Sequence, residues 1–289
     1  MGTAKYLIAK KTDHNWGAVI STVGIQETPA GESYPYGEHP KKYIFTVDKG
    51  RVLHDFHVLY ITKGKGWVST AHCPKTELRA GDAAIIFPNE WHSYAPEKET
   101  GWTEAWIDFT GDLVDRIITQ HFFDISHPVL RVGISDTICN AFSKAVEVAY
   151  AEQPAHQQQL AGFVALIVSY IYAKSKQQVY KNNPKTDQIN QARQFMRKNL
   201  SNNIRMEEVA QEVGLGYTHF RKMFREYTGF SPNQYYLNLK MEKAKDYLSN
   251  TRLCSKEIAF RLGFDSAAYF VKAFRLHCGI SPLEFRGRI

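Results

Sequence analysis

Arginine and lysine side chains recur at matching places in two segments near the C-terminal end of this chain. The first segment carries Arg221, Lys222 and Arg225, and the second carries Lys272 and Arg275. Cationic side chains along one face of a helix can hold phosphate groups or read guanine edges in duplex DNA. Two such segments in tandem therefore predict contacts with double-stranded DNA.

The two segments are copies of one unit. Gly214 and Gly263 are 49 residues apart, whereas Phe220 and Phe270 are 50 apart, so the second copy has one more residue in its turn. Each copy combines a short amphipathic helix, a tight turn and a second helix with a cationic face. This is the pattern of a helix-turn-helix, whose second helix enters the major groove.

The second helix of each copy is predicted at about 217–227 and 266–277, with phenylalanines facing inward. The residues left to face DNA are Thr218, Arg221, Lys222, Arg225, Ser266, Ala267, Tyr269, Lys272 and Arg275. Because the second helix offers fewer side chains that can read bases, we expect the first helix to dominate specificity.

A helix of about 232–249 is predicted to join the two copies. It begins with Ser231-Pro232 and has Gln234 at the third helical position, which forms a capping box. The second copy repeats this signal at its own end with Ser281-Pro282 and Glu284. Such a helix is roughly 27 Å long at about 1.5 Å per residue, which suits two recognition helices about one DNA turn apart.

Charge and composition divide the chain in the same way. Residues 1–186 hold 19 Lys and Arg against 19 Asp and Glu, whereas residues 187–289 hold 17 against 10 and carry the whole net charge of +7. A neutral half followed by a basic half indicates a sensor joined to a binder of polyanions. The sequence lacks a long apolar run, a secretory leader and a C-x-x-C pair, so we expect a cytoplasmic protein without a membrane span.

The N-terminal half changes from strand patterns to helix patterns. Short runs rich in β-formers at 58–62, 83–87 and 102–109 are separated by turn signals, as in a sandwich or barrel. Apolar residues at helical spacing then predict helices at 134–151 and 157–173. The second of these helices is apolar on more than one side, which fits packing against its own domain or a dimer seam.

These patterns predict three parts: a sensing and dimerisation domain at 1–175, a polar linker at 176–186 and a DNA-binding domain at 187–289. The predicted fold class is α+β. A cupin-like β-barrel with two helices is followed by an all-α domain, in which a long helix joins two helix-turn-helix modules.

Residues 187–289 resemble the DNA-binding domain of the AraC/XylS family of bacterial transcription regulators. The second copy is close to the family signature, from Ile258-Ala259 through Gly263-Phe264 to Ile280-Ser281-Pro282. Residues of about 40–110 resemble the sugar-sensing cupin half of the arabinose-type members, through Gly64-x-Gly66, Phe87-Pro88-x3-His92-x-Tyr94 and Trp102-x3-Trp106-x2-Phe109.

The resemblance implies a barrel that takes a small molecule, followed by two helices that dimerise. By position, Arg51 and Tyr94 match ligand-binding residues, and Trp106 matches a tryptophan that stacks on the sugar. Glu104 stands where the arabinose sensor has a histidine, and His92 completes the predicted ligand set. An aromatic plate with charged hydrogen-bonding groups suits a sugar, which has an apolar face and a rim of hydroxyls.

We therefore predict a DNA-binding regulator, an activator on family grounds, controlled by a sugar of carbohydrate breakdown. The expected partners are double-stranded DNA, the sugar and a second copy of the chain, with RNA polymerase as a further candidate; no cofactor and no enzyme activity are expected. Two alternatives stay open. One is a metal-dependent cupin enzyme with a DNA-binding appendage, although His54 and His57 would point to opposite faces of a strand. The other is a ligand-free regulator whose barrel only dimerises.

Overall fold

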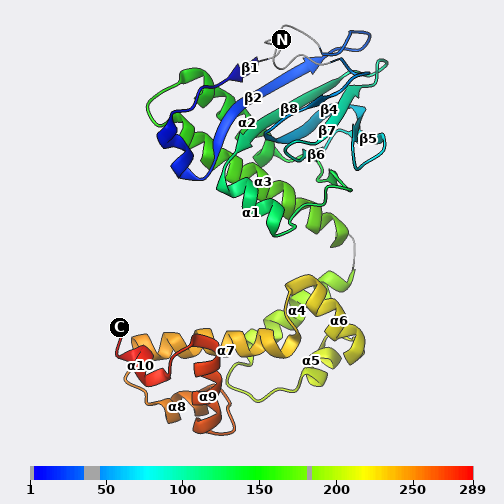
Figure 1. Cartoon of the computed structure of the whole chain (residues 1–289). Coiled ribbons are helices and arrows are strands. Elements are labelled where there is room, and N and C mark those ends of the chain that lie inside the picture. The colour runs from blue at the N-terminus through cyan, green and yellow to red at the C-terminus, as the bar shows by residue number, and fades with distance from the viewer. Residues whose placement is uncertain (1–2, 36–45, 181–183, 289) are drawn as a thin grey trace. The chain divides into compact units, whose positions relative to one another are not determined.

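The chain divides into two units, Met1–Lys181 and Asn182–Ile289, of which the first contains every described strand and the second is helical (Figure 1). The computed structural model describes residues 3–35, 46–180 and 184–288. None of the described helices combines the length and apolar character that a membrane span needs. The predicted α+β fold class is confirmed.

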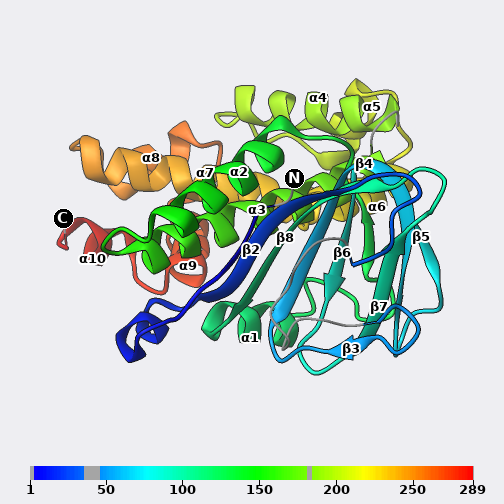
Figure 2. The same cartoon turned by 90° about the horizontal axis from the view of Figure 1, so that it is seen from above.

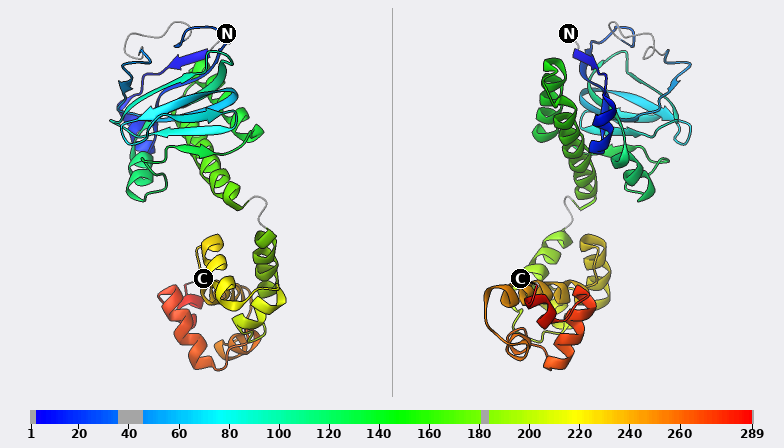
Figure 3. Two further views of the ribbon diagram at one scale, coloured as in Figure 1. Left: turned by 90° about the vertical axis from the view of Figure 1, so that its right-hand side faces the viewer. Right: turned by 60° about the vertical axis from the view of Figure 1, so that its left-hand side comes forward.

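The first unit is an antiparallel sheet with helices packed on one side (Figures 2 and 3). Its strands are β1 (Thr3–Tyr6), β2 (Val19–Thr28), β3 (Arg51–Val52), β4 (Phe56–Thr70), β5 (Thr76–Arg79), β6 (Asp82–Ile86), β7 (Trp91–Pro96), β8 (Trp102–Thr110) and β9 (Val129–Arg131). Its helices are the 3₁₀ helix η1 (Lys11–Trp16) and the α-helices α1 (Asp112–Thr119), α2 (Asp136–Ala151) and α3 (His156–Tyr180).

The 15-residue strand β4 holds the sheet together because it has two sets of neighbours. Its first part pairs with β8 and β6, and its second part pairs with β5 and β7. One path of paired strands runs β1-β2-β8-β4-β6-β9, and β7 with β3 and β5 branch from β4. Among the described residues this path does not close into a ring, so the predicted barrel is an open, barrel-like sheet.

Side chains of β4 alternate between two cores, as the period of a strand requires. Phe56, Val58 and Tyr60 join the core beneath α1, α2 and α3. Leu59 and Ile61 point the other way, into a core between the strands. Both faces of the first part of the strand are therefore buried, which explains its apolar run at 58–61.

Helix α3 is anchored to the sheet by a buried glutamine. The side chain of Gln157 accepts a hydrogen bond from the N–H of Ile20 at 3.0 Å and donates one to the Ile20 carbonyl at 3.0 Å. The register of β2 against β8 shifts between Ile20 and Thr22, so the glutamine amide satisfies backbone groups that the sheet leaves unpaired. Helix α3 thus packs against its own unit, one of the two arrangements expected for it.

The predicted linker at 176–186 is helical at both of its ends. Helix α3 continues through 176–180, and α4 begins at Pro184, a proline at the start of a helix where its missing N–H costs nothing. The boundary between the two units falls within this segment, and its role as a linker stays a prediction. Residues 181–183 lie outside the described part of the chain.

The second unit contains two small cores joined by one helix. Its helices are α4 (Pro184–Lys198), α5 (Met206–Glu212), α6 (Tyr217–Thr228), α7 (Pro232–Asn250), α8 (Ser255–Arg261), α9 (Ala267–Cys278) and α10 (Pro282–Arg286). Phe220 and Phe224 are fully buried in the first core, and Phe270 and Phe274 occupy the same places in the second. Helix α7 contributes Tyr236 to the first core and other side chains to the second.

The duplicated helix signals form as predicted. The Ser231 hydroxyl accepts from the N–H of Gln234 at the start of α7, and Ser281 does the same for Glu284 at the start of α10. Four residues separate α5 from α6 and five separate α8 from α9, which confirms the extra residue in the second turn.

Candidate ligand pocket and DNA-binding helices

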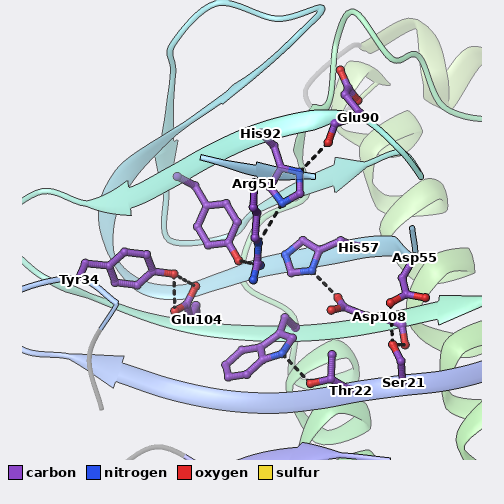
Figure 4. Close-up of polar contacts among 12 residues, drawn as sticks. Ser21, Thr22, Tyr34, Arg51, Asp55, His57, Glu90, His92, Glu104 and Asp108 are labelled. Atoms are coloured by element: carbon purple, nitrogen blue, oxygen red, sulfur yellow. Dashed lines mark hydrogen bonds and ion pairs between the residues drawn. The ribbon is translucent and has the colours of Figure 1, made fainter. Parts of the chain in front are cut away.

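A cavity of about 420 Å³, counting the space open to solvent, lies between strands of the first unit (Figure 4). Its lining is rich in groups that form hydrogen bonds and in aromatic rings. The lining residues are Tyr6, Thr22, Gln26, Tyr34, Pro35, Arg51, Tyr94, Glu104, Trp106 and Asp108.

Strand β8 supplies three of these residues because side chains two apart share a face. Glu104, Trp106 and Asp108 point into the cavity, while the intervening Ala105 and Ile107 join the core against the helices. The same rule puts His92 and Tyr94 of β7 on one face. One amphipathic strand thus builds a large part of the pocket wall.

Gly24 makes room for the Trp106 ring. It pairs with Trp106 across β2 and β8, and a Cβ added at Gly24 would overlap that ring. The indole N–H donates to the Thr22 hydroxyl at 3.3 Å. Glycine at position 24 and a hydrogen bond at the ring edge therefore set the orientation of the aromatic plate in the pocket.

Arg51 is held by partners on β7. Its Nη2 donates to the Tyr94 hydroxyl at 2.6 Å, and its Nε donates to His92 Nε2 at 3.2 Å. His92 Nδ1 is 3.0 Å from the Glu90 carbonyl, so Nδ1 carries the proton and Nε2 is the acceptor. Burial lowers the pKa of His92 to about 3, which keeps the ring neutral beside the guanidinium.

Glu104 is a buried carboxyl that shares a hydrogen bond with Tyr34. The Tyr34 hydroxyl is 3.0 Å and 3.2 Å from its two oxygens. Burial raises the pKa of Glu104 to about 7, although the hydrogen bond from Tyr34 and the charge of Arg51 act in the opposite direction. The pocket therefore contains a carboxyl that gains or loses its proton near neutral pH.

His57 and Asp108 form a second buried pair, at the end of the pocket away from Tyr34 (Figure 4). His57 Nδ1 is hydrogen-bonded to an Asp108 oxygen, and both side chains are almost fully buried. The His57 ring stacks at 5.7 Å from the Tyr94 ring. Asp108 is thereby oriented by His57 while it also lines the cavity.

The cavity brings together four of the five ligand residues predicted from the sequence, Arg51, Tyr94, Glu104 and Trp106. The fifth, His92, lies behind Arg51 and supports it rather than lining the cavity. Lining residues that were not predicted are Tyr6, Thr22, Gln26, Tyr34, Pro35 and Asp108. The strand alternation from Glu104 through Trp106 could have found Asp108, whereas no local pattern marks Tyr34.

The histidines do not assemble a metal site in the described parts of the chain. His54 precedes β4 and bonds to Asn89 in an exposed position, whereas His57 is buried in the pocket wall. No group of three or more His, Cys, Asp or Glu side chains among residues 3–35, 46–180 and 184–288 is arranged to hold a metal ion.

The raised pKa of Glu104 predicts a pH-dependent stability. Because the folded chain holds this proton up to a pH of about 7, and an ordinary glutamate loses it near 4.5, the free energy of unfolding falls as pH rises between these values. The loss is on the order of 3 kcal/mol and is complete above the higher value. Glu104→Gln, which has no proton to lose there, is expected to remove this part of the decline.

Urea unfolding followed by tryptophan fluorescence tests this prediction, since all five tryptophans lie within residues 16–106 and report the first unit alone. The matched control is Glu99→Gln, at an exposed glutamate near the start of β8. A Glu104→Gln protein with the same decline as wild type between acid and neutral pH would contradict the assignment.

In the first helix-turn-helix, α6 exposes the predicted DNA-facing side chains. Thr218, Arg221, Lys222 and Arg225 are all exposed, opposite the buried phenylalanines of the same helix. Lys222 lies 4.0 Å from Glu226 one turn later, an exposed contact of little energetic value. Helix α6 thus exposes a cationic face to solvent, on the side opposite its buried phenylalanines.

In the second helix-turn-helix, α9 exposes Tyr269, Lys272 and Arg275. Ser266 has a structural role that was not predicted: its hydroxyl accepts from the N–H of Tyr269 at 3.1 Å and caps the helix. Ala267 is half-buried against the second core. The Ser266 hydroxyl is therefore shared with the helix cap, and both residues stay predicted DNA contacts.

Comparison with known proteins agrees with the two-unit architecture. Residues 46–167 match the AraC-like ligand binding domain, and residues 209–288 match a helix-turn-helix domain. The Msm operon regulatory protein of Streptococcus mutans is 24% identical over 244 residues, which cover 83% of this chain and 87% of that protein.

Two further relatives match along most of their length. The lactose operon transcription activator of Staphylococcus xylosus is 25% identical over 256 residues, covering 84% of this chain and 86% of that protein. The raffinose operon transcriptional regulatory protein of Pediococcus pentosaceus is 25% identical over 248 residues, covering 83% and 88%. With an AraC-like ligand-binding domain before its helix-turn-helix domain, the chain belongs to the AraC family of DNA-binding transcription regulators that respond to small molecules.

Proposed function

We propose that the pocket of the first unit binds a neutral sugar of carbohydrate breakdown, and that this sugar controls DNA binding by the second unit. The observation that carries the proposal is the convergence of an aromatic plate, Trp106, with Arg51, Glu104 and Asp108 around one cavity. The names of the relatives support it, because two of them regulate the lactose and raffinose operons.

The pocket chemistry matches the two kinds of surface on a sugar. The Trp106 ring offers an apolar face for the C–H side of a pyranose. Arg51 is a fixed donor, while the carboxyls of Glu104 and Asp108 accept hydrogen bonds from hydroxyls. Since two carboxyls face one guanidinium, a neutral ligand suits the pocket better than an acidic sugar.

The experiment is a thermal-shift measurement on the full chain with lactose, raffinose, their monosaccharides and glucuronate. A neutral sugar at about 100 times its Kd should add roughly 2.7 kcal/mol to the stability of the first unit, and glucuronate should add none. If every neutral sugar leaves the melting temperature unchanged, the proposal fails and the ligand-free regulator is favoured. Turnover of a sugar with a bound metal would favour the enzyme alternative.

We also propose, from the family resemblance, that the chain acts as a homodimer and that RNA polymerase is a further partner. Sugar binding would then change which pair of DNA sites the dimer spans. Sedimentation equilibrium with and without the stabilising sugar measures the first part of this proposal. A monomer at micromolar concentration under both conditions would contradict it.

Within the DNA-binding unit, we propose that Arg221 reads a base. Its exposed position on the cationic face of α6 supports this role. If it does so, Arg221→Ala should weaken binding to a preferred duplex by about 1–3 kcal/mol and relax the preference at one base pair. Fluorescence anisotropy on duplexes selected from a random library measures both effects, and Glu207→Ala, at an exposed residue of α5, is the control. An unchanged affinity and an unchanged salt slope would reject the role.

A further inference from the structure

Lys240 is a buried lysine between the two helix-turn-helix modules. It lies in the middle of α7, and the residue is only 4% exposed. Its Nζ lies 4.6 Å from the centroid of the Tyr236 ring and 5.0 Å from that of Phe264. A buried cation needs a specific compensation, because burial alone disfavours the charge. Here burial lowers the pKa of Lys240 to about 8, so the side chain stays largely cationic at neutral pH.

The hydrogen bonds of Lys240 join backbone groups of both modules. Nζ donates to the Asn202 carbonyl at 3.2 Å, in the loop before α5, and to the Gly263 carbonyl at 3.3 Å, in the turn between α8 and α9. The Tyr236 hydroxyl also donates to the Asn202 carbonyl at 2.7 Å. The lysine thus connects the loop of the first module to the turn that leads into the second recognition helix.

Backbone of the two modules meets at this point. A Cβ added at Gly263, whose φ is +61°, would lie 2.7 Å from the Ser201 carbonyl oxygen and 2.8 Å from the Asn202 carbonyl carbon. Beside this contact, the Asn203 amide donates to the Asp265 carboxylate at 2.9 Å. Glycine at position 263 therefore permits both the positive φ and the close approach.

The equivalent turn of the first copy has no such neighbour. At Gly214 the nearest atom to an added Cβ is 3.8 Å away, in the Gln188 side chain. The same Gln188, on α4 of the first module, donates to the Val213 carbonyl at 2.8 Å. The first turn is therefore held by its own module, whereas the second turn is held by the first module and α7.

We propose that Lys240 is a positioning residue that locks the second module against the first, and that it thereby sets the separation of the two DNA segments contacted by α6 and α9. The lock consists of Lys240, the carbonyls of Asn202 and Gly263, and the Asn203–Asp265 contact. Gly263 lies four residues before α9 begins. A shift of this turn therefore moves the second recognition helix directly. A rigid pair of helices reads two sites only at one spacing.

The test uses the full chain and a duplex selected by it from a random-sequence library. Footprinting locates the two protected segments, and a second duplex has one base pair inserted between them. Wild type is expected to bind the inserted duplex at least about tenfold more weakly, since the insertion rotates one site away from its helix. Lys240→Met should bind the selected duplex about tenfold more weakly than wild type does. Its affinities for the selected and the inserted duplex should differ by less than about threefold, because a loosened second module can adjust to the new spacing.

Variants on and near the lock complete the experiment. Lys240→Arg keeps donors and charge and is expected to keep the penalty for insertion, whereas Lys243→Met, at a more exposed position on the same helix that pairs with Asp246, is the matched control. Asn203→Ala tests the lock from an exposed residue, so it remains informative if Lys240→Met does not fold by circular dichroism. A full insertion penalty in Asn203→Ala, and in Lys240→Met where that variant folds, would overturn the proposal.

Discussion

Replacement of Arg51 by methionine is expected to abolish the stabilisation of the first unit by sugar while DNA binding through the second unit remains. Arg51 is the cationic donor in the pocket lining, and Tyr94 and His92 hold it in place. Hydrogen bonds from a charged group contribute about 1.5–3 kcal/mol each. Loss of two such bonds to a sugar, with Glu104 and Asp108 left beside an apolar side chain, should weaken binding by a factor of at least about 100.

Isothermal titration with the sugar that stabilises wild type measures this loss. Arg79→Met is the matched control, since Arg79 belongs to the same unit but is exposed and pairs with Glu77. Arg51→Lys should fall between the two, because lysine keeps the charge without the planar fork. If a folded Arg51→Met protein bound the sugar with wild-type affinity, Arg51 would not contact the sugar. Trp106 would then be the main residue left to support a sugar site.

The second large effect is expected in the helical unit, where Phe274→Ala should reduce the free energy of unfolding by about 3–5 kcal/mol. Phe274 is fully buried, and its ring is 5.8 Å from that of Phe270 and 5.6 Å from that of Phe285. The second module has a small core, so few neighbours can fill the space that the missing ring leaves. Specific DNA binding should weaken because the second recognition helix loses its support, while α6 keeps the contacts expected to dominate specificity.

Urea unfolding followed by circular dichroism measures this change, because helices dominate the second unit whereas tryptophan fluorescence reports the first. Leu276→Ala is the control: Leu276 lies two residues further along α9 and is 79% exposed, so its loss should change stability by less than about 0.5 kcal/mol. An equal stability of Phe274→Ala and Leu276→Ala would show that the second core does not hold the module.

The two recognition helices and the helix that joins them could be predicted from the sequence. The elements of the helical unit depend on local signals, namely capping boxes at Ser231 and Ser281 and glycines at the ends of α6 and α9, and each signal occurs twice. Helices at 217–227 and 266–277 were predicted within one residue of α6 and α9 at either end. The contact through Lys240 was not predicted, since it joins residues up to 38 apart in the chain.

The pocket could be predicted only in part, because its members come from strands far apart in the sequence. Strand periodicity and the family resemblance both pointed to β8, which contributes Glu104 and Trp106. Tyr34 reaches Glu104 across 70 residues, and no spacing or composition indicates such a contact. The pairing of His57 with Asp108, 51 residues away, depends in the same way on the register of β4 against β8.

The two faces of β8 have a mechanical consequence for signalling. One face presents Glu104, Trp106 and Asp108 to the cavity, while Ile107 and Phe109 are embedded among the side chains of α1, α2 and α3. A densely filled interior transmits displacement instead of absorbing it. A ligand that displaces the Trp106 ring is therefore expected to shift the side chains of β8 that pack in the core under the helices, so this strand would couple the cavity to the helical layer of the same unit.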